Sequence, residues 1–210
     1  MKKRIAFVHN AMWEMYNFRG ELLQELKAKG YEITVICPPD EKNAHYFTDL
    51  GIKLLTVSMS RKGTNIKEDV QLVKNLFKVY KKEKFDLVFH YTIKPNIYGT
   101  LAAKLAGIKS IAITTGLGYV FLHNNITSLI AKFMYKFSLA FANEVWFLND
   151  DDMNIFLDKD LITERQAFKL PSEGINTKRF VPKEKNRKDS KTVFLMIARV
   201  LYDKGFNEYL

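Results

Sequence analysis

Cysteine is nearly absent from this chain of 210 residues, which contains only Cys37. A lone cysteine cannot form an internal disulfide, so disulfide-stapled secreted domains are excluded and a reducing compartment, the cytoplasm, is expected. Long hydrophobic runs are absent too, because no stretch reaches the roughly 18 uncharged residues of a membrane-spanning helix. The apolar run after the basic N-terminus, Ile5 to Val8, is too short for a secretion signal, and we expect none.

Glycine is missing from the first predicted loop. A strand is predicted over residues 3–9, and no glycine follows it before Gly20. A dinucleotide-binding fingerprint needs glycines at this place, where the backbone approaches a pyrophosphate, so that fingerprint is excluded. The loop, predicted over residues 11–17, instead holds two methionines and two aromatic residues. Such side chains either grip an apolar or sugar-containing ligand or pack onto neighbouring helices.

The composition is that of a globular and basic protein. Hydrophobic residues make up 47% and charged residues 27%, and lysine plus arginine exceed aspartate plus glutamate by 33 to 23, a formal net charge of +10. This balance favours anionic partners: nucleic acid, phosphorylated small molecules or an acidic membrane surface. The lysines are spread over predicted helices without an aromatic-laced motif, so nucleic acid is not expected as a partner.

Apolar runs alternate with helical patterns along the chain. Strands are predicted over 3–9, 32–37, 52–57, 86–91, 109–114, 144–148, 167–171 and 192–198, and helices over 18–29, 40–50, 95–106, 126–142 and 150–157, with a further long helix capped by Asn65. The strands are continuously apolar, which is typical of a parallel sheet buried on both faces. The fold class is therefore α/β, with a doubly wound, Rossmann-like parallel sheet.

Two domains are predicted. Residues 1–182 are predicted to form a first, Rossmann-like domain, and the polar, charged stretch 183–191 a linker. Residues 192–210 then open a new strand, loop and helix start, which is the truncated beginning of a second domain. Arg199 and Lys204 flank that loop, where a guanidinium fork, an ammonium group and helix amides suit a diphosphate.

Candidate residues follow the strands, because ligands of such sheets bind at the carboxyl ends. His90 and Lys94, around the end of the fourth strand, suit an anion or a hydroxyl group, although His90 is equally compatible with a buried structural histidine. Gly116 and Gly118, after the fifth strand, permit a tight turn or a close approach to a ligand.

Two other stretches carry alternative interpretations. Asp150 and Asp152 after the sixth strand fit a divalent metal bound to a nucleotide diphosphate, but a helix N-terminus with stabilising negative charge is favoured, because a second set of ligands is missing. The helix predicted over 126–142 has few charges. It is either an interfacial helix at a lipid surface or a core-packing helix.

With these loops identified, the chain resembles the family 4 glycosyltransferases of GT-B architecture. The stretches that carry the resemblance are HNAMWEMYNFRGELLQELKAKGYEITVICP, HYTIKPNIYGTLAAKLAGIKSIAITTGLGY, EGINTKRF and IARVLYDKGF. It is most similar to bacterial members that build capsule, lipopolysaccharide or lipid-linked oligosaccharides. In such enzymes two Rossmann-like domains face each other, the first binding the acceptor and the second the sugar nucleotide.

The resemblance implies a retaining, hexosyltransferase-type enzyme without a cofactor or metal, using a nucleotide-diphosphate sugar, UDP-sugar above all. The implied acceptor is lipid-linked or a nascent polysaccharide, met in the cytoplasm at the inner face of the plasma membrane. Arg199 and Lys204 then hold the donor diphosphate. The acceptor residues are His9, Asn17, His90, Lys94, Gly116 and Gly118.

Several departures from the family pattern limit this assignment. The glutamates of the family's acidic motif fall after Leu210, so we expect this chain alone to be inactive. NAMWEMY replaces a glycine-rich loop, and TTGLG lacks a histidine that many relatives carry. The catalytic base is therefore unassigned, with His90 the candidate. Three alternatives stay open: a stand-alone acceptor-binding and membrane-recruiting subunit of a split enzyme, a metal-dependent enzyme using Asp150 and Asp152, and a sugar-nucleotide epimerase of similar architecture.

Overall fold

The computed structural model describes residues 2–60, 65–117, 121, 126–171, 173–182, 192–198, 200 and 204–209. Contacts divide the chain into two compact units, Met1–Glu173 and Gly174–Leu210. The two units meet after Glu173, which is earlier than the domain boundary predicted after residue 182. The predicted domain boundary stays a prediction.

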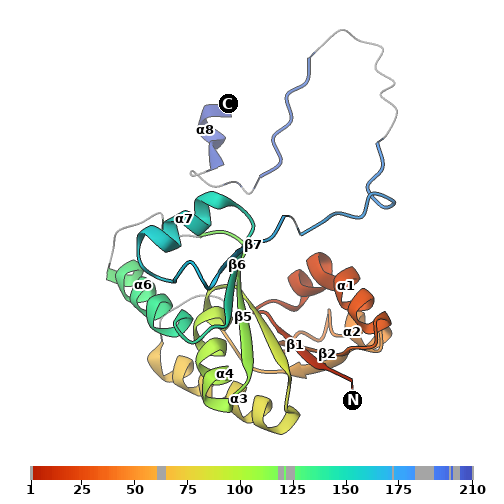
Figure 1. Ribbon diagram of the computed structural model, residues 1–210. Helices are drawn as coiled ribbons and strands as arrows, with labels where there is room; N and C mark the ends of the chain where they lie inside the picture. The colour runs from red at the N-terminus through yellow and green to blue at the C-terminus, as the bar shows by residue number, and fades with distance from the viewer. Residues whose placement is uncertain are drawn as a thin grey trace. The chain divides into compact units, whose positions relative to one another are not determined.

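The first unit is built on one sheet of seven parallel strands (Figure 1). Their order is β3-β2-β1-β4-β5-β6-β7, so the chain winds outward from β1 to one edge and then from β4 to the other. The doubly wound α/β fold predicted from the apolar runs is confirmed. The strands are β1 Arg4–Val8, β2 Glu32–Cys37, β3 Lys53–Thr56, β4 Leu87–Tyr91, β5 Lys109–Thr114, β6 Glu144–Phe147 and β7 Ala167–Lys169.

Alternate residues of each strand face different helices. In β1, Ile5 and Phe7 pack with helices α1 (Met12–Ala28) and α2 (His45–Asp49), while Ala6 and Val8 pack with α3 (Ile66–Glu83) and α4 (Thr100–Ala106). A third cluster joins β5 and β6 to α6 (Ile126–Leu139) and α7 (Asp150–Asp158). The buried positions thus lie on both faces of the sheet, as a parallel sheet requires.

Helix α1 begins earlier than predicted. The segment 11–17 was predicted as a loop, but the helix starts at Met12. Met12 and Met15 are buried in the core, so the ligand-gripping interpretation is wrong for these two residues. The start of the helix could not be recognised from the sequence, because Ala11 occupies the N-cap and an alanine side chain makes no capping hydrogen bond.

Two other helix starts follow their sequence signals. The predicted cap at Asn65 is confirmed, since its side chain accepts a hydrogen bond from the amide of Lys67. The helix predicted from Pro95 is confirmed as helical, but its first turn, η1 (Pro95–Gly99), is a π-helix that continues into α4. π-turns are uncommon and frequently lie at functional sites.

The second unit contains little regular structure in the residues described. The strand predicted over 192–198 is not formed, so this prediction is wrong for the structure. A strand needs a hydrogen-bonded neighbour, and in the described part of residues 174–210 none runs beside it. The unit ends in the short helix α8 (Phe206–Tyr209), where the Tyr209 hydroxyl donates a hydrogen bond of 2.8 Å to the carbonyl of Phe194.

Candidate functional site

The strand order reverses direction between β1 and β4, so the carboxyl ends of these two strands are the first place to look for a site. The chain passes from β1 to β2 on one side and reaches β4 on the other, and ligands of open α/β sheets bind where the order reverses in this way. His9 follows β1, and Tyr91 ends β4. Their ring centroids lie 6.1 Å apart, so the fold brings the two side chains together.

His9 is held in a defined orientation. The amide of Ala11 donates a hydrogen bond of 2.9 Å to His9 Nδ1, so the neutral ring carries its proton on Nε2. That Nε2 lies 3.9 Å from Glu14 Oε2. The side chain is mostly buried but reaches the surface, which is consistent with the ligand contact that the resemblance implies for it.

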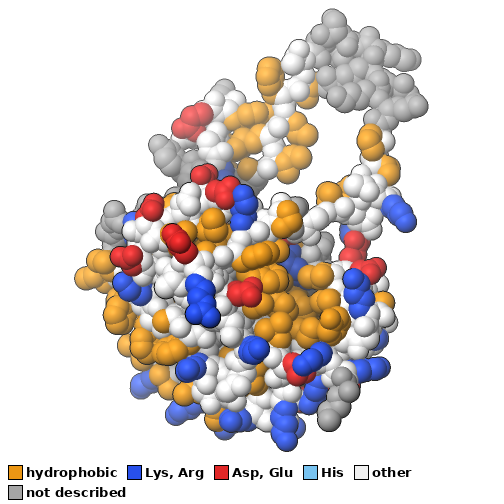
Figure 2. Space-filling model, viewed as in Figure 1, with side chains coloured by type: hydrophobic (Ala, Val, Ile, Leu, Met, Phe, Trp, Pro, Cys, Tyr) orange, Lys and Arg blue, Asp and Glu red, His pale blue; other side chains and the backbone are white. Residues whose placement is uncertain are grey.

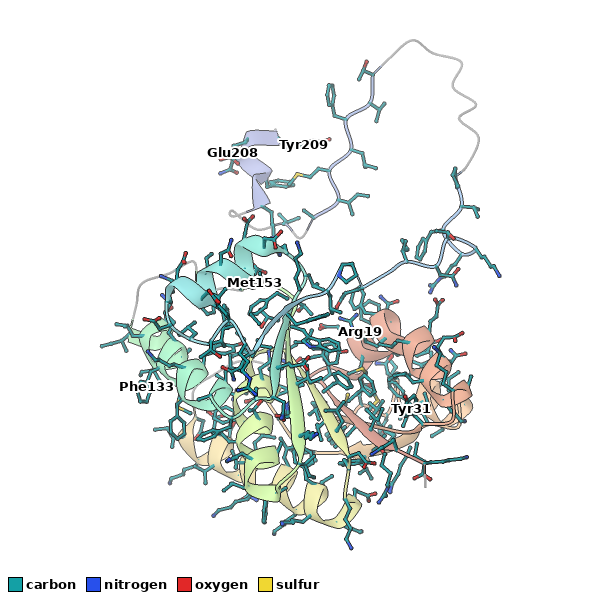
Figure 3. The ribbon with its side chains drawn as sticks, viewed as in Figure 1. Arg19, Tyr31, Phe133, Met153, Glu208 and Tyr209 are labelled. Carbon is teal, nitrogen blue, oxygen red and sulfur yellow. The ribbon has the colours of Figure 1, made fainter. Side chains whose placement is uncertain are left out.

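A buried cation lies over the Tyr91 ring. Arg19 projects from α1, as Figure 3 shows, and its guanidinium carbon is 4.8 Å from the ring centroid. Arg19 also forms an ion pair with Glu173. Burial raises the pKa of the Tyr91 phenol to about 12, while the nearby guanidinium opposes that rise. The phenol therefore stays protonated at neutral pH and can donate a hydrogen bond. Arg19, Tyr91 and His9 make a site suited to an anion or hydroxyl groups.

Three buried oxygen atoms around the ends of β4 and β5 have no hydrogen-bond partner within the described residues: Thr92 Oγ1, Asn96 Oδ1 and Thr114 Oγ1. Thr92 also has a positive φ of 71°, a strained conformation for threonine. Asn96 lies in the π-turn, and its Nδ2 donates a hydrogen bond of 3.0 Å to the carbonyl of Ile113. Buried polar atoms usually find a partner, so this edge of the sheet offers acceptors to a ligand or water.

Three further acceptor residues were predicted from the sequence: Asn17, Gly116 and Gly118. Gly116 has a φ of 148° with open space where a Cβ would lie, so this conformation favours glycine. Asn17 is exposed on α1. Gly118 lies outside the described residues. The acceptor-binding roles of these three residues stay predictions.

His90 is fully buried. Its Nε2 lies 2.9 Å from the Tyr80 hydroxyl, its Nδ1 lies 3.4 Å from Thr100 Oγ1, and a Cβ on Gly99 would meet the ring. This packing joins β4 to α3 and α4. A side chain with no exposed surface contacts no acceptor in this structure, so the environment supports a structural role, and the catalytic and acceptor-binding roles predicted for His90 stay predictions.

Acid should destabilise the fold through His90. Burial lowers its pKa from 6.5 to about 3, so below pH 6.5 the unfolded chain takes up a proton that the folded protein does not. Stability attributable to His90 is then lost as pH falls, by about 2–3 kcal/mol between about pH 6 and pH 4. We expect the difference in unfolding free energy between the unaltered chain and His90→Gln to change by this amount. Parallel pH profiles for the two proteins would contradict it.

Lys94 is placed on the other side of the sheet from Arg19. Its Nζ donates hydrogen bonds of 2.7 Å to Asp69 Oδ1 and 2.8 Å to Ser60 Oγ, and the Tyr98 hydroxyl donates one of 2.8 Å to Asp69 Oδ2. This cluster borders a hollow of about 380 Å³ beside the start of α3. The structure thus separates Lys94 from the group at His9, and its predicted acceptor contact is not tested.

The acidic stretch after β6 caps a helix. The Asn149 side chain accepts a hydrogen bond of 2.7 Å from the amide of Asp152, and Asp150 pairs with Lys169 at 2.7 Å. The predicted helix N-terminus with negative charge in its first turn is confirmed. Among the described residues no group of three histidine, cysteine, aspartate or glutamate side chains is placed to hold a metal ion.

Two residues, Arg199 and Lys204, were predicted to bind the diphosphate of the sugar donor. Arg199 lies outside the described residues, and Lys204 is exposed just before α8 in the second unit. Their predicted role at a donor diphosphate stays a prediction.

Sequence reasoning missed Arg19, although a signal was present. With α1 starting at Met12, Arg19 falls on the same helix face as Met12, Met15 and Leu23, all buried. A charged residue in a buried stripe needs a partner or a ligand, and so marks a candidate site. Misplacing the start of the helix concealed this pattern.

Comparison with known proteins shows which protein family this chain is related to. A sequence profile of the family described as "Glycosyl transferase 4-like" matches residues 4–149. The chain is 32% identical to the N,N'-diacetylbacillosaminyl-diphospho-undecaprenol alpha-1,3-N-acetylgalactosaminyltransferase of Campylobacter jejuni, covering 98% of this chain and 58% of that protein. It is 24% identical to the UDP-Gal:alpha-D-GlcNAc-diphosphoundecaprenol alpha-1,3-galactosyltransferase of Escherichia coli, covering 83% and 47%. The chain thus spans about half the length of these curated relatives.

Solved structures share the fold. HepE of Anabaena, crystallised with UDP and glucose, superposes with a TM-score of 0.60 at 15% identity, covering 83% of this chain and 45% of that one. Proteins of similar fold include both glycosyltransferases and UDP-N-acetylglucosamine 2-epimerases, so this likeness shows the architecture alone. The profile match, which extends over most of the first unit, is what establishes the relationship: the chain belongs to the glycosyl transferase 4-like family.

Proposed function

We propose that this chain is the acceptor-binding part of a retaining glycosyltransferase. The whole enzyme transfers a sugar from a nucleotide-diphosphate sugar, a UDP-sugar, to a lipid-linked diphosphate glycan. It works in cell-surface glycan biosynthesis, in the cytoplasm at the inner face of the plasma membrane. The 210 residues alone bind acceptor but do not transfer sugar.

The observation that carries this proposal is the match of 98% of the chain to a transferase whose name specifies an undecaprenol-linked diphosphate acceptor. The second relative is named for the same class of acceptor and for UDP-galactose as donor. Both names specify an alpha-1,3 transfer. The two relatives differ in the sugar that they transfer, so the sugar is left open here.

The chemistry at the ends of β1, β4 and β5 agrees with such an acceptor. The Arg19 guanidinium pairs with the Glu173 carboxylate in this structure, and a diphosphate would take the place of that carboxylate, since a planar fork of donors matches phosphate oxygens. The oxygens of Asn96 and Thr114 that have no partner among the described residues are buried in this structure, and they would accept from sugar hydroxyl groups once a bound acceptor displaced the side chains that cover them. His9 lies beside Tyr91, the ring over which Arg19 packs, and the amide of Ala11 fixes the orientation of its imidazole.

A binding assay tests the proposal. The chain is titrated with a short-chain polyprenyl-diphosphate sugar, with the same sugar lacking the lipid diphosphate, and with a UDP-sugar. Trp13, half exposed on α1, provides a fluorescence signal. We expect the lipid-diphosphate sugar to bind tightest. Conversion of the UDP-sugar to an epimer without any acceptor would overturn the proposal in favour of an epimerase.

Arg19→Gln should weaken acceptor binding about thirtyfold, because a charge-assisted hydrogen bond is worth about 2 kcal/mol. Arg165→Gln is the matched control, since Arg165 is exposed, and we expect it to bind within about twofold of the unaltered chain. Circular dichroism checks that both variants fold. Equal affinities for the two variants would remove Arg19 from the acceptor site.

A further inference from the structure

One side of α6 is an exposed apolar stripe. Besides Ile126 at the first position of the helix, four of its large side chains are at least half exposed: Leu129 at 64%, Ile130 at 56%, Phe133 at 68% and Phe137 at 50%. At 100° per residue they share an arc about 100° wide, the width by which a helix normally faces a core. These four residues are called the α6 stripe below. An apolar helix face open to water calls for a partner.

The opposite side of α6 is buried in the core of the first unit. Tyr135 and Leu139 are buried in the cluster formed with β6 and α7, and Ser138 is buried as well. The α6 stripe therefore faces outward on a helix whose other side packs against β6 and α7. Figure 3 shows Phe133 projecting from the edge of the unit, and Figure 2 shows apolar side chains gathered over α6. The core-packing alternative is thus confirmed for one side of the helix, while the interfacial alternative stays a prediction for the exposed side.

Basic residues border the α6 stripe. The helix contains no acidic residue, and its exposed Lys136 lies next to the stripe on the helix surface. Lys132 follows along the same border. On the neighbouring helix α4, Lys104 Nζ lies 5.5 Å from the ring centroid of Phe141, just after α6. An apolar stripe edged by cations complements a bilayer, whose interior is apolar and whose surface is anionic in the cytoplasmic leaflet.

We propose that the α6 stripe is a membrane-contact surface that inserts into the headgroup region of an anionic bilayer. This inference rests on the proposed function, because a lipid-linked acceptor is reached at such a surface. No helix in the described ranges is long and apolar enough to cross a membrane. The helix therefore lies along the surface, with Phe133 and Phe137 among the acyl chains and Lys136 at the phosphates.

The experiment is sedimentation of the 210-residue chain with vesicles of phosphatidylcholine mixed with phosphatidylglycerol. We expect binding to these vesicles and little binding to phosphatidylcholine alone. Phe133→Ser should lower the vesicle partition coefficient about tenfold, because an inserted aromatic side chain is lost. Phe18→Ser, on α1 at 60% exposed, is the matched control and should stay within about twofold.

Charge is tested in the same assay. Lys136→Glu should reduce binding about tenfold or more, while Lys78→Glu, an exposed lysine on α3, makes the same change of net charge and should have little effect. Equal losses for the two variants would mean that only the overall charge matters, and would overturn the proposed surface. So would unchanged binding by Phe133→Ser. A dimer that Phe133→Ser converts to a monomer, with vesicle binding unaltered, would identify a contact between two copies instead.

These outcomes are independent of the acceptor assay. The vesicles contain neither acceptor nor sugar nucleotide, so vesicle binding that depends on the α6 stripe stands even if the acceptor fails to bind. Conversely, acceptor binding in detergent by the Phe133→Ser variant supports the proposed function whatever the vesicles show. Leu129→Ser, with Leu22→Ser on α1 as its control, repeats the test with a second pair.

Discussion

Replacing Lys94 by methionine is expected to lower the free energy of unfolding by about 3–5 kcal/mol, since it leaves the buried carboxylate of Asp69 without its cation. The two side chains are each only 9% exposed, and their ion pair of 2.7 Å ties the start of η1 to α3. Tyr98 remains as the one other hydrogen-bond donor to Asp69 among those described above. Urea denaturation of both proteins measures the difference.

Lys3→Met provides a matched control. Lys3 pairs with Asp86 at 3.4 Å, but the two side chains are 69% and 41% exposed, so solvent screens the pair. We expect its unfolding free energy to equal that of the unaltered chain within error. The double variant Lys94→Met with Asp69→Asn should recover much of the loss, because no unpaired charge remains. A loss at Lys94 as small as that at Lys3 would show that water in the adjoining hollow already solvates Asp69.

Replacing Gly99 by alanine is expected to cost about 2–3 kcal/mol of stability through overpacking. A Cβ at this position would lie 2.5 Å from His90 Cδ2 and 2.6 Å from His90 Nε2. The ring cannot move aside easily, because it is fully buried and held by Tyr80. The higher helix propensity of alanine offsets only about 1 kcal/mol of this cost. Thermal and denaturant unfolding measure the change.

Gly20→Ala, within α1, is the control for Gly99→Ala. There the new Cβ would lie 3.3 Å from Tyr16 Cδ2, the nearest atom, and Tyr16 is only partly buried, so the ring can shift slightly. We expect this variant to be as stable as the unaltered chain or slightly more stable. If Gly99→Ala behaves in the same way, His90 has room to reorient, and its rigid structural role would be refuted.

The strands were predictable because apolar residues predominate in their runs and turn or helix signals separate one run from the next. Seven of the eight predicted strands are present within a few residues, and each is paired in the buried sheet. The eighth, over 192–198, fails because apolar composition alone forms no strand without a neighbour. The start of α1 was missed for a different reason: Ala11 gives no capping signal, and the helix is held by its buried methionines. Tertiary packing, invisible in the local sequence, decided both cases.

The candidate site was only partly predictable. Strand ends point to one edge of the sheet, and this reasoning found the stretch around β4, while His9 came from the family resemblance. It could not separate His90, which turns into the core, from Tyr91, which faces Arg19, because successive strand residues point to opposite faces. Nor could it pair Arg19 with Glu173, which lie 154 positions apart.

The position of β1 in the sheet has a consequence for how the chain assembles during synthesis. Strand β2 can pair with β1, and β3 with β2, as soon as they leave the ribosome, but the other edge of β1 pairs with β4, with Ile5 opposite Leu87. Until residue 87 or so has emerged, that edge of β1 stays open and can accept a foreign strand. Once β4 docks, β5, β6 and β7 each add to the strand made just before. Of the strand pairings in this sheet, β1–β4 spans the most sequence, so we expect it to be the slowest to form and a nascent chain stalled before it to be the form most in need of a chaperone.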